Sequence, residues 1–182
     1  MGSGGITNRG PLHGRPRAQP RDLVLREARQ ADAAPLLRWR NDPAAVSASR
    51  ESRRVEPSEH ARWLERVLAD PDRHLLLAER GCKPVGQVRF DRVRGYWYEV
   101  SVSVERQSRA EGIGNALVAA AVDWLWQNTN ATAIDAWVRA ENERSLRTFE
   151  GSGFRELPGE HDDVFRLLRL ERPDPWAAVL RR

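Results

Sequence analysis

Hydrophobic residues recur along this chain with two different periods. Side chains return to the same face of a strand every second residue, and to the same face of a helix after about 3.6 residues. The clearest short period runs from Tyr96 to Val104, where three valines alternate with Glu99, Ser101 and Ser103. This alternation predicts a half-buried strand with one apolar face and one polar face.

The same patterns predict a mixed α/β domain over residues 22–171, between an N-terminal and a C-terminal tail. Further strands are predicted at Leu23–Glu27, His74–Ala78, Pro84–Asp91, Thr132–Val138, Phe154–Glu156 and Val164–Leu170. Helices are predicted at Ala31–Trp39, from Ser58 to about Leu68, at Gly112–Gln127 and at Asn142–Glu150. A polar loop is expected between the first two helices, from Asn41 to Pro57. The order of elements favours one mixed sheet flanked by helices.

Charge is concentrated in the first residues of the chain. The net charge is +4, and residues 1–21 carry four arginines, at positions 9, 15, 17 and 21, and no acid. The remaining 22–182 region is therefore close to neutral, and we expect no nucleic-acid partner. Residues 1–21, which are rich in Gly, Pro and Arg, are predicted to be a disordered basic tail, and 172–182 a second tail.

Two absences in the sequence narrow the class of protein. No apolar run approaches the roughly 18 residues of a membrane span, and the N-terminus has no apolar stretch suited to a secretory signal. We therefore expect no membrane partner and a cytoplasmic protein.

Cys82 is the only cysteine, which excludes an intramolecular disulfide and a multi-cysteine zinc site. We expect Cys82 to be a surface thiol and the protein to hold no metal.

The segment after the Tyr96–Val104 strand has the composition of an anion site. A polar turn leads into the helix that begins near Gly112, and Gly114 follows. The first turn of a helix has unpaired N–H groups and partial positive charge, and glycine lets that backbone approach a ligand. The two glycines can equally serve tight packing. A dinucleotide fingerprint and a Walker loop are both absent.

Two motifs give the chain a resemblance to the GNAT superfamily of N-acetyltransferases. Arg109-Ala110-Glu111-Gly112-Ile113-Gly114 matches that superfamily's pattern Q/R-x-x-G-x-G/A. About thirty residues later, the segment from Asn142 to Phe154 resembles N-x-x-S-x-x-x-Y-x-x-x-G-F. The resemblance implies a splayed central sheet and acetyl-CoA as the co-substrate, and it allows a homodimer.

The resemblance also assigns roles to residues. The backbone of Arg109, Ala110, Glu111, Gly112, Ile113 and Gly114 would hold the pyrophosphate of the coenzyme. Val102, Ser103 and Val104 would pair with the pantetheine arm, and Asn142 and Ser145 would approach the arm or the adenosine end. Phe149 would lie beside the thioester, where many relatives have a tyrosine that protonates the departing thiolate.

Acetyl transfer to an amine requires a neutral amine, a stabilised oxyanion and a thiolate that can leave. Glu99 is the candidate base, although it can equally be an exposed strand carboxylate. A backbone N–H near Val102 is the expected oxyanion donor. Because phenylalanine cannot donate a proton, Tyr98 is the candidate acid, with Tyr96, Ser145 or a water as alternatives.

The segments W-R-N-D-P, at residues 39–43, and E-H-x-x-W, at residues 59–63, resemble two GNAT groups. These are the nucleotide-linked amino-sugar acetyltransferases and the ribosomal-protein N-terminal acetyltransferases. The resemblance makes Arg40, Asn41 and His60 candidates for binding the acceptor, although all three can be structural. We slightly favour a nucleotide-linked amino sugar over another small amine. The alternatives are a protein N-terminus as acceptor and a non-catalytic module that binds acyl-CoA.

Overall fold

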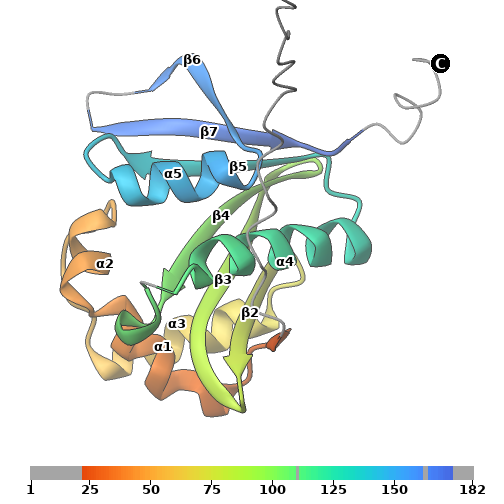
Figure 1. The fold of residues 1–182 in the computed structure, drawn as a ribbon. Coiled ribbons are helices and arrows are strands. Elements are labelled where there is room, and N and C mark those ends of the chain that lie inside the picture. The colour runs from red at the N-terminus through yellow and green to blue at the C-terminus, as the bar shows by residue number, and fades with distance from the viewer. Residues whose placement is uncertain (1–21, 110, 162–163, 174–182) are drawn as a thin grey trace, which may run out of the picture.

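Seven strands form one mixed sheet in the computed structural model, which describes residues 22–109, 111–161 and 164–173 (Figure 1). The strand order is β1-β2-β3-β4-β5-β7-β6, and only the β4–β5 pair is parallel. The strands are β1 Leu23–Glu27, β2 Arg73–Arg80, β3 Lys83–Arg94, β4 Trp97–Val104, β5 Ala133–Arg139, β6 Arg155–His161 and β7 Phe165–Glu171. The mixed α/β class predicted from the sequence is confirmed.

Helices cover both faces of this sheet. The α-helices are α1 Ala33–Arg40, α2 Pro43–Ala48, α3 Pro57–Ala69, α4 Ile113–Asn128 and α5 Glu143–Gly151, and two short 3₁₀ helices are η1 Gln30–Asp32 and η2 Arg106–Ser108. In Figure 1, α4 and α5 lie in front of the sheet, whereas α1 and α3 lie behind its lower half. No helix in the described part of the chain is long and apolar enough to cross a membrane.

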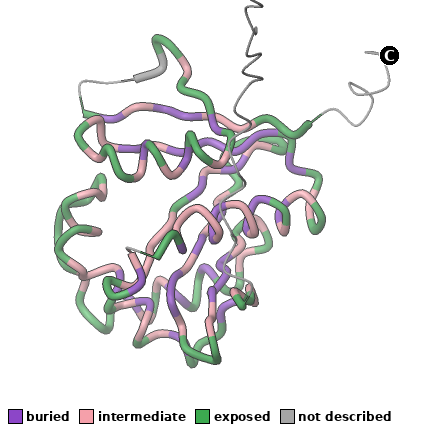
Figure 2. The backbone as a smooth tube through the Cα atoms, viewed as in Figure 1, coloured by how far each residue is buried: buried purple, intermediate pink, exposed green. Residues whose placement is uncertain are grey.

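Each face of the sheet has its own apolar core. Alternation along β2 sends the buried side chains of Leu76 and Leu77 to opposite faces. Leu76 joins the larger cluster under α4 and α5, together with Phe90 and Leu117. Leu77 joins a smaller cluster under α1 and α3, which also contains Trp39 and Leu64. The buried segments of Figure 2 follow the strands and the inner sides of these helices.

The centre of the sheet splits between β4 and β5. These strands are paired only from Trp97↔Ala133 to Glu99↔Asp135. Beyond that point β4 stays paired with β3 as far as Val104, and β5 stays paired with β7 as far as Arg139. The two strands therefore diverge like the arms of a V (Figure 1), as the resemblance implied.

Close backbone packing holds the C-terminal arm of β4 in place. Gly86 of β3 faces Ser103 of β4 and Leu117 of α4, and a Cβ at Gly86 would lie 2.8 Å from the Ser103 carbonyl oxygen and 2.9 Å from Leu117 Cδ2. Such distances are too short for any side chain, so glycine is required here. This packing fixes the position of the strand segment that borders the split.

The structure corrects one element and extends others. The polar loop expected from Asn41 to Pro57 contains α2, whose N-cap Asp42 accepts a hydrogen bond from the Ala44 amide at 3.0 Å. An Asp-Pro pair is a recognised helix start, because the carboxylate caps the first turn and proline needs no N–H there. β3 runs on to Arg94 and β6 to His161, beyond their predicted ends. The predictions for 1–21 and for 174–182 lie outside the described residues.

Candidate active site

Two adjoining cavities open at the split between β4 and β5. The large cavity has a volume of about 600 Å³ and lies on the side of α1, α3 and the 49–55 segment. The small cavity, of about 410 Å³, lies toward the first turns of α4 and α5. Their shared walls are Ala45, Ala48, Val102, Ser103, Asn142, Ser145 and Phe149. Because they share walls, an elongated ligand in the small cavity can present its end to a molecule in the large one.

A tight turn joins β4 to α4 at the end of the small cavity. Gly112 has a φ of +75°, in the left-handed region that favours glycine, and α4 begins at the next residue. The first amides of α4 have no intrahelical acceptor and carry the positive end of the helix dipole. Gly114 lines the small cavity, while Ile113 is fully buried in the core. Ala110 lies outside the described residues.

Side chains fasten this turn from two directions. Arg109 Nε donates to the carbonyl of Val104 at 2.9 Å, and its Nη2 pairs with Asp42 of α2, also at 2.9 Å. Arg144 of α5 donates to the carbonyl of Arg109. The Arg109 guanidinium is therefore engaged by the protein, and the turn has to bind a ligand mainly through its backbone.

The small cavity is lined by cationic side chains. Arg109, Arg144 and Arg147 line it, and no carboxylate is among its described lining residues, although Asp42 and Glu143 pair with Arg109 and Arg147 from outside it. Glu111, the acid within the turn, pairs with Arg80 of β2, so a cation balances its charge. Positive side chains beside a helix N-terminus suit a pyrophosphate or another polyanion. These residues therefore fit the phosphate-bearing end of a coenzyme.

The three residues expected from α5 do meet at the split. Asn142 is the N-cap of α5, and its Oδ1 accepts from the Ser145 amide at 3.2 Å. Phe149, one turn after Ser145, is buried and meets Phe154 edge-on, with 5.1 Å between ring centroids. All three line both cavities, as do Val102 and Ser103 from β4. Val104 lines the small cavity alone.

Glu99 lies where the split between β4 and β5 begins, and it lines the large cavity. Its strand neighbours Asp91 and Asp135 pair with Arg89 at 2.8 Å and with Arg169 at 2.6 Å. Glu99 forms no ion pair or hydrogen bond within the described ranges. Burial raises the pKa of Glu99, an effect that the nearby Arg50 opposes. A carboxyl group with a raised pKa can take up a proton nearer neutral pH, as a general base must.

Tyr98 does not meet the other candidates. Its side chain points to the face of the sheet opposite to that of Glu99, because the two residues are adjacent on β4. Tyr98 is 6% exposed and belongs to the cluster under α4. It lines neither cavity, because its ring is packed in the core under α4. Tyr96 is exposed beside the β3–β4 turn. The two hydroxyl-bearing residues among the described walls that both cavities share are Ser103 and Ser145, and Ser145 lies one helical turn before Phe149.

Two of the three candidates for acceptor binding face the large cavity. Arg40 and His60 line it, whereas Asn41 does not. The Asn41 amide is used structurally, since Nδ2 donates to the Val55 carbonyl at 2.8 Å and Oδ1 accepts from the Val55 amide at 2.7 Å. His60 is 3% exposed, and burial together with the Arg40 charge lowers the pKa of its imidazole. His60 is therefore neutral at physiological pH.

The two tryptophans near these candidates are packing residues. Trp39 is 2% exposed, and its indole N–H donates to Glu105 Oε2 at 2.6 Å. Glu105 also accepts from Arg38 at 2.8 Å and from the Arg106 amide at 3.0 Å. α1 is thus tied directly to the start of the turn that leads to α4. Trp63 packs against the same smaller core and also lines the large cavity.

Several lining residues of the large cavity were not predicted. Arg50 follows α2 and lies over the Trp137 ring of β5, 4.9 Å from its centroid. Arg139 is two residues after Trp137, and its guanidinium lies 4.9 Å from the Phe165 centroid. Alternation along β5 places Trp137 and Arg139 on one face, but nothing in the sequence joins them to Arg50.

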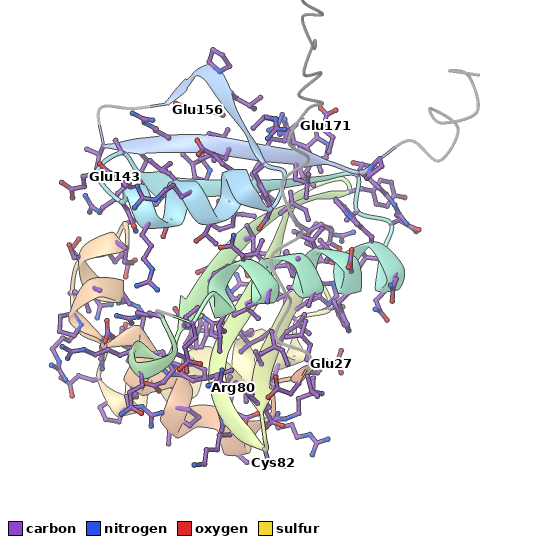
Figure 3. All side chains as sticks on the ribbon, viewed as in Figure 1. Glu27, Arg80, Cys82, Glu143, Glu156 and Glu171 are labelled. Atoms are coloured by element: carbon purple, nitrogen blue, oxygen red, sulfur yellow. The ribbon has the colours of Figure 1, made fainter. Side chains whose placement is uncertain are left out.

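Cys82 lies at the tip of the β2–β3 hairpin, far from the split (Figure 3). It is exposed and unpaired, with a φ of +60°. It lines neither of the two cavities. Within the described residues, no group of three or more His, Cys, Asp or Glu side chains is placed to hold a metal ion.

Comparisons with known proteins agree with this geometry. The family model of the acetyltransferase (GNAT) domain matches residues 22–155, and no curated protein sequence gives a significant match. Spermidine N-acetyltransferase from Vibrio cholerae, solved with CoA and spermine, has a TM-score of 0.74 and 15% identity over 82% of this chain and 95% of that one. Aminoglycoside acetyltransferase AAC(6')-Ib, solved with coenzyme A, has a TM-score of 0.70 and 20% identity over 82% of this chain and 95% of that one. A domain from Methanocaldococcus jannaschii has a TM-score of 0.70 and 19% identity over 82% of this chain and 98% of that one.

Proposed function

The chain belongs to the GNAT acetyltransferase family and is an N-acetyltransferase with acetyl-CoA as donor, and from this premise we propose that its acceptor is a small primary amine bound in the large cavity. The observation that supports this assignment is the pair of adjoining cavities that meet at Ser145 and Phe149, with Glu99 in the wall of the large one. The coenzyme fits the small cavity and the split between the strands, and the acceptor fits the large cavity.

The donor side is assigned to the residues around the small cavity. The backbone from Arg109 to Gly114 holds the pyrophosphate, with Arg144 and Arg147 adding positive charge. Val102, Ser103 and Val104 offer strand backbone that β5 no longer pairs, which suits the amide groups of a pantetheine arm. Asn142 and Ser145 approach the arm, and Phe149 packs beside the thioester.

On the acceptor side, Glu99 takes the proton that the amine loses, directly or through a water. Acetyl-CoA supplies the acetyl group as a thioester, which the amine nitrogen attacks as the carbon–sulfur bond breaks. A backbone N–H near Val102 stabilises the carbonyl oxygen as it gains negative charge. The Ser145 hydroxyl, or a water beside it, supplies the proton to the departing thiolate, because Phe149 has none to give.

Among small amines we favour a nucleotide-linked amino sugar. The large cavity has room for a sugar and carries several arginines, which suit phosphate groups. A protein N-terminus is the second candidate acceptor, and the open 49–55 wall of the cavity favours it. A module that binds acyl-CoA without turnover is the third, and Phe149 in place of tyrosine favours it.

The test measures the release of CoA from acetyl-CoA. Chromatography detects the CoA, because a thiol reagent would also react with Cys82. The acceptors are UDP-linked amino sugars, N-terminal peptides, polyamines and aminoglycosides. Turnover with UDP-linked amino sugars above the other classes supports the proposal. Turnover with peptides alone selects the second candidate, and coenzyme binding without turnover selects the third. Sedimentation in the same buffers tests the homodimer, which only the resemblance implies.

A further inference from the structure

The large cavity has an excess of arginine. Its lining includes Arg40, Arg50, Arg53, Arg66, Arg89 and Arg139 against Glu51, Glu59 and Glu99. Arg53 is balanced by Glu59 at 2.5 Å, and Arg89 by Asp91 at 2.8 Å. The remaining four arginines have no carboxylate partner within residues 22–109, 111–161 and 164–173. Like charges around one cavity repel, so this arrangement is unfavourable until an anion enters it.

Two of these arginines converge on one segment of chain. Arg40 Nη2 donates to the Glu51 carbonyl at 3.0 Å, and Arg139 Nη2 donates to the Ser49 carbonyl at 3.1 Å. Arg40 comes from α1 and Arg139 from the end of β5, so the 49–51 segment brings the two guanidinium groups to one corner of the cavity.

Buried polar atoms in this corner lack partners. Arg40 Nη1 and Arg139 Nε are buried without a hydrogen-bond acceptor in the described structure. His60 is 3% exposed, and burial together with the charge of Arg40 lowers the pKa of its imidazole. Its Nε2 atom is also buried without a hydrogen-bond partner in the described structure. Buried donors are normally satisfied, so unsatisfied ones on side chains that line a cavity indicate a missing partner with acceptor atoms.

We propose that Arg40, His60 and Arg139 form an anion subsite, so that the acceptor carries a phosphate or a carboxylate in addition to its amine. This proposal rests on the proposed function and narrows its acceptor class. The amine lies at Glu99 and the anion at the Arg40 corner, so both ends of one molecule are recognised. Arg50, which lies near Glu99 over Trp137, adds positive charge between them and disfavours acceptors with a second cationic group.

A matched series of amino sugars tests the acceptor class. Glucosamine, glucosamine 6-phosphate and muramic acid share the same primary amine and differ in having no anion, a phosphate or a carboxylate. We expect kcat/KM for at least one anionic sugar to exceed that of glucosamine by about tenfold or more, as charge-assisted hydrogen bonds allow. The better anionic sugar identifies the source of the negative charge. Equal turnover of all three, or faster turnover of glucosamine or spermidine, overturns the subsite.

A binding measurement tests the subsite without turnover. The protein is saturated with CoA, so that the small cavity is filled, and inorganic phosphate is titrated while the His60 ring signal is followed by NMR. We expect saturable movement of that signal, weakened about tenfold or more in Arg40→Gln and in Arg139→Gln. Arg62→Gln, which removes a positive charge from an exposed position on α3 outside the cavity, is the control and should bind phosphate like the wild type.

The outcomes separate the two proposals. Phosphate binding at His60 without turnover of any amine contradicts the proposed function and retains an anion site. Turnover of an anionic amino sugar that Arg40→Gln does not change contradicts the subsite and retains the enzyme. CoA affinity is measured for each variant as a check on folding. If Arg40→Gln does not bind CoA, Arg40→Lys, which keeps the charge, replaces it. Phosphate that leaves the His60 signal unmoved overturns the subsite in either case.

Discussion

Glu99 of β4 and Asp135 of β5 face each other in the last residue pair that joins these two strands. Asp135 is held by Arg169 at 2.6 Å, whereas Glu99 has no such partner in the described chain and turns to the large cavity. The point at which strand pairing ends is therefore also the point at which a half-buried carboxyl group lines the large cavity. This single position underlies the first two predictions.

Glu99→Gln is expected to lower kcat/KM by about 10²–10⁴, the range usual for loss of a general base. In the wild type kcat/KM should rise with pH through the raised pKa of Glu99, because only the carboxylate accepts a proton. The variant should lack this limb of the pH profile. Asp123→Asn, at an exposed position on α4, is the matched control and should leave the profile unchanged. A Glu99→Gln enzyme with the wild-type pH profile would remove Glu99 from the mechanism.

The same substitution is expected to raise thermal stability at neutral pH. The pKa of Glu99 is higher in the folded protein than in the unfolded chain, because burial disfavours the charged form. Its contribution to stability is therefore fully present below the unfolded pKa of about 4.3 and is lost as pH rises through the folded pKa. Glutamine carries no charge and avoids that loss. Melting temperatures measured from pH 4 to pH 8 should show an advantage for the variant that grows with pH, and a constant difference would contradict this account.

The Arg109–Asp42 ion pair is expected to control affinity for acetyl-CoA. This pair, 2.9 Å long and largely buried, joins the turn before α4 to the N-cap of α2. Arg109→Gln and Asp42→Asn should each raise KM for acetyl-CoA severalfold and lower the free energy of unfolding by about 1 kcal/mol. Asparagine is as good an N-cap as aspartate, so Asp42→Asn isolates the charge from the cap.

A double-mutant cycle measures this coupling directly. If the ion pair acts as proposed, the double variant should be little worse than either single one, in both KM and stability. Additive effects would mean that the two residues act independently, and the turn would then depend on the Arg109–Val104 hydrogen bond instead.

Phe149→Tyr is expected to leave kcat unchanged or to raise it. Phe149 lines both cavities beside Ser145, and a tyrosine hydroxyl there could protonate the thiolate. Steady-state rates with acetyl-CoA and the best acceptor provide the measurement. A large fall in kcat with unchanged stability would show that Phe149 is needed to pack the acyl group against Phe154.

Local pattern determined most elements of this protein and the turn that precedes α4. Alternation over Tyr96–Val104 identified β4, and the turn from Arg109 to Gly114 lies at a helix start as its glycines require. The same alternation already separates Glu99 from Tyr98, because neighbouring residues of a strand face opposite sides. Tyr98 lies in the core under α4 and lines neither cavity, whereas Glu99 lines the large one. The Asp42-Pro43 pair likewise carried the signal for α2.

The lining of the large cavity was decided only by tertiary structure. Arg40, Arg50 and Arg139 come from α1, the segment after α2 and β5, and no sequence period relates positions so far apart. The direction of a side chain in a turn is also set by its contacts, which is why Asn41 pins Val55 and leaves the large cavity to Arg40. Sequence periodicity encodes which face of an element is buried. Which faces of different elements meet depends on how the whole chain packs.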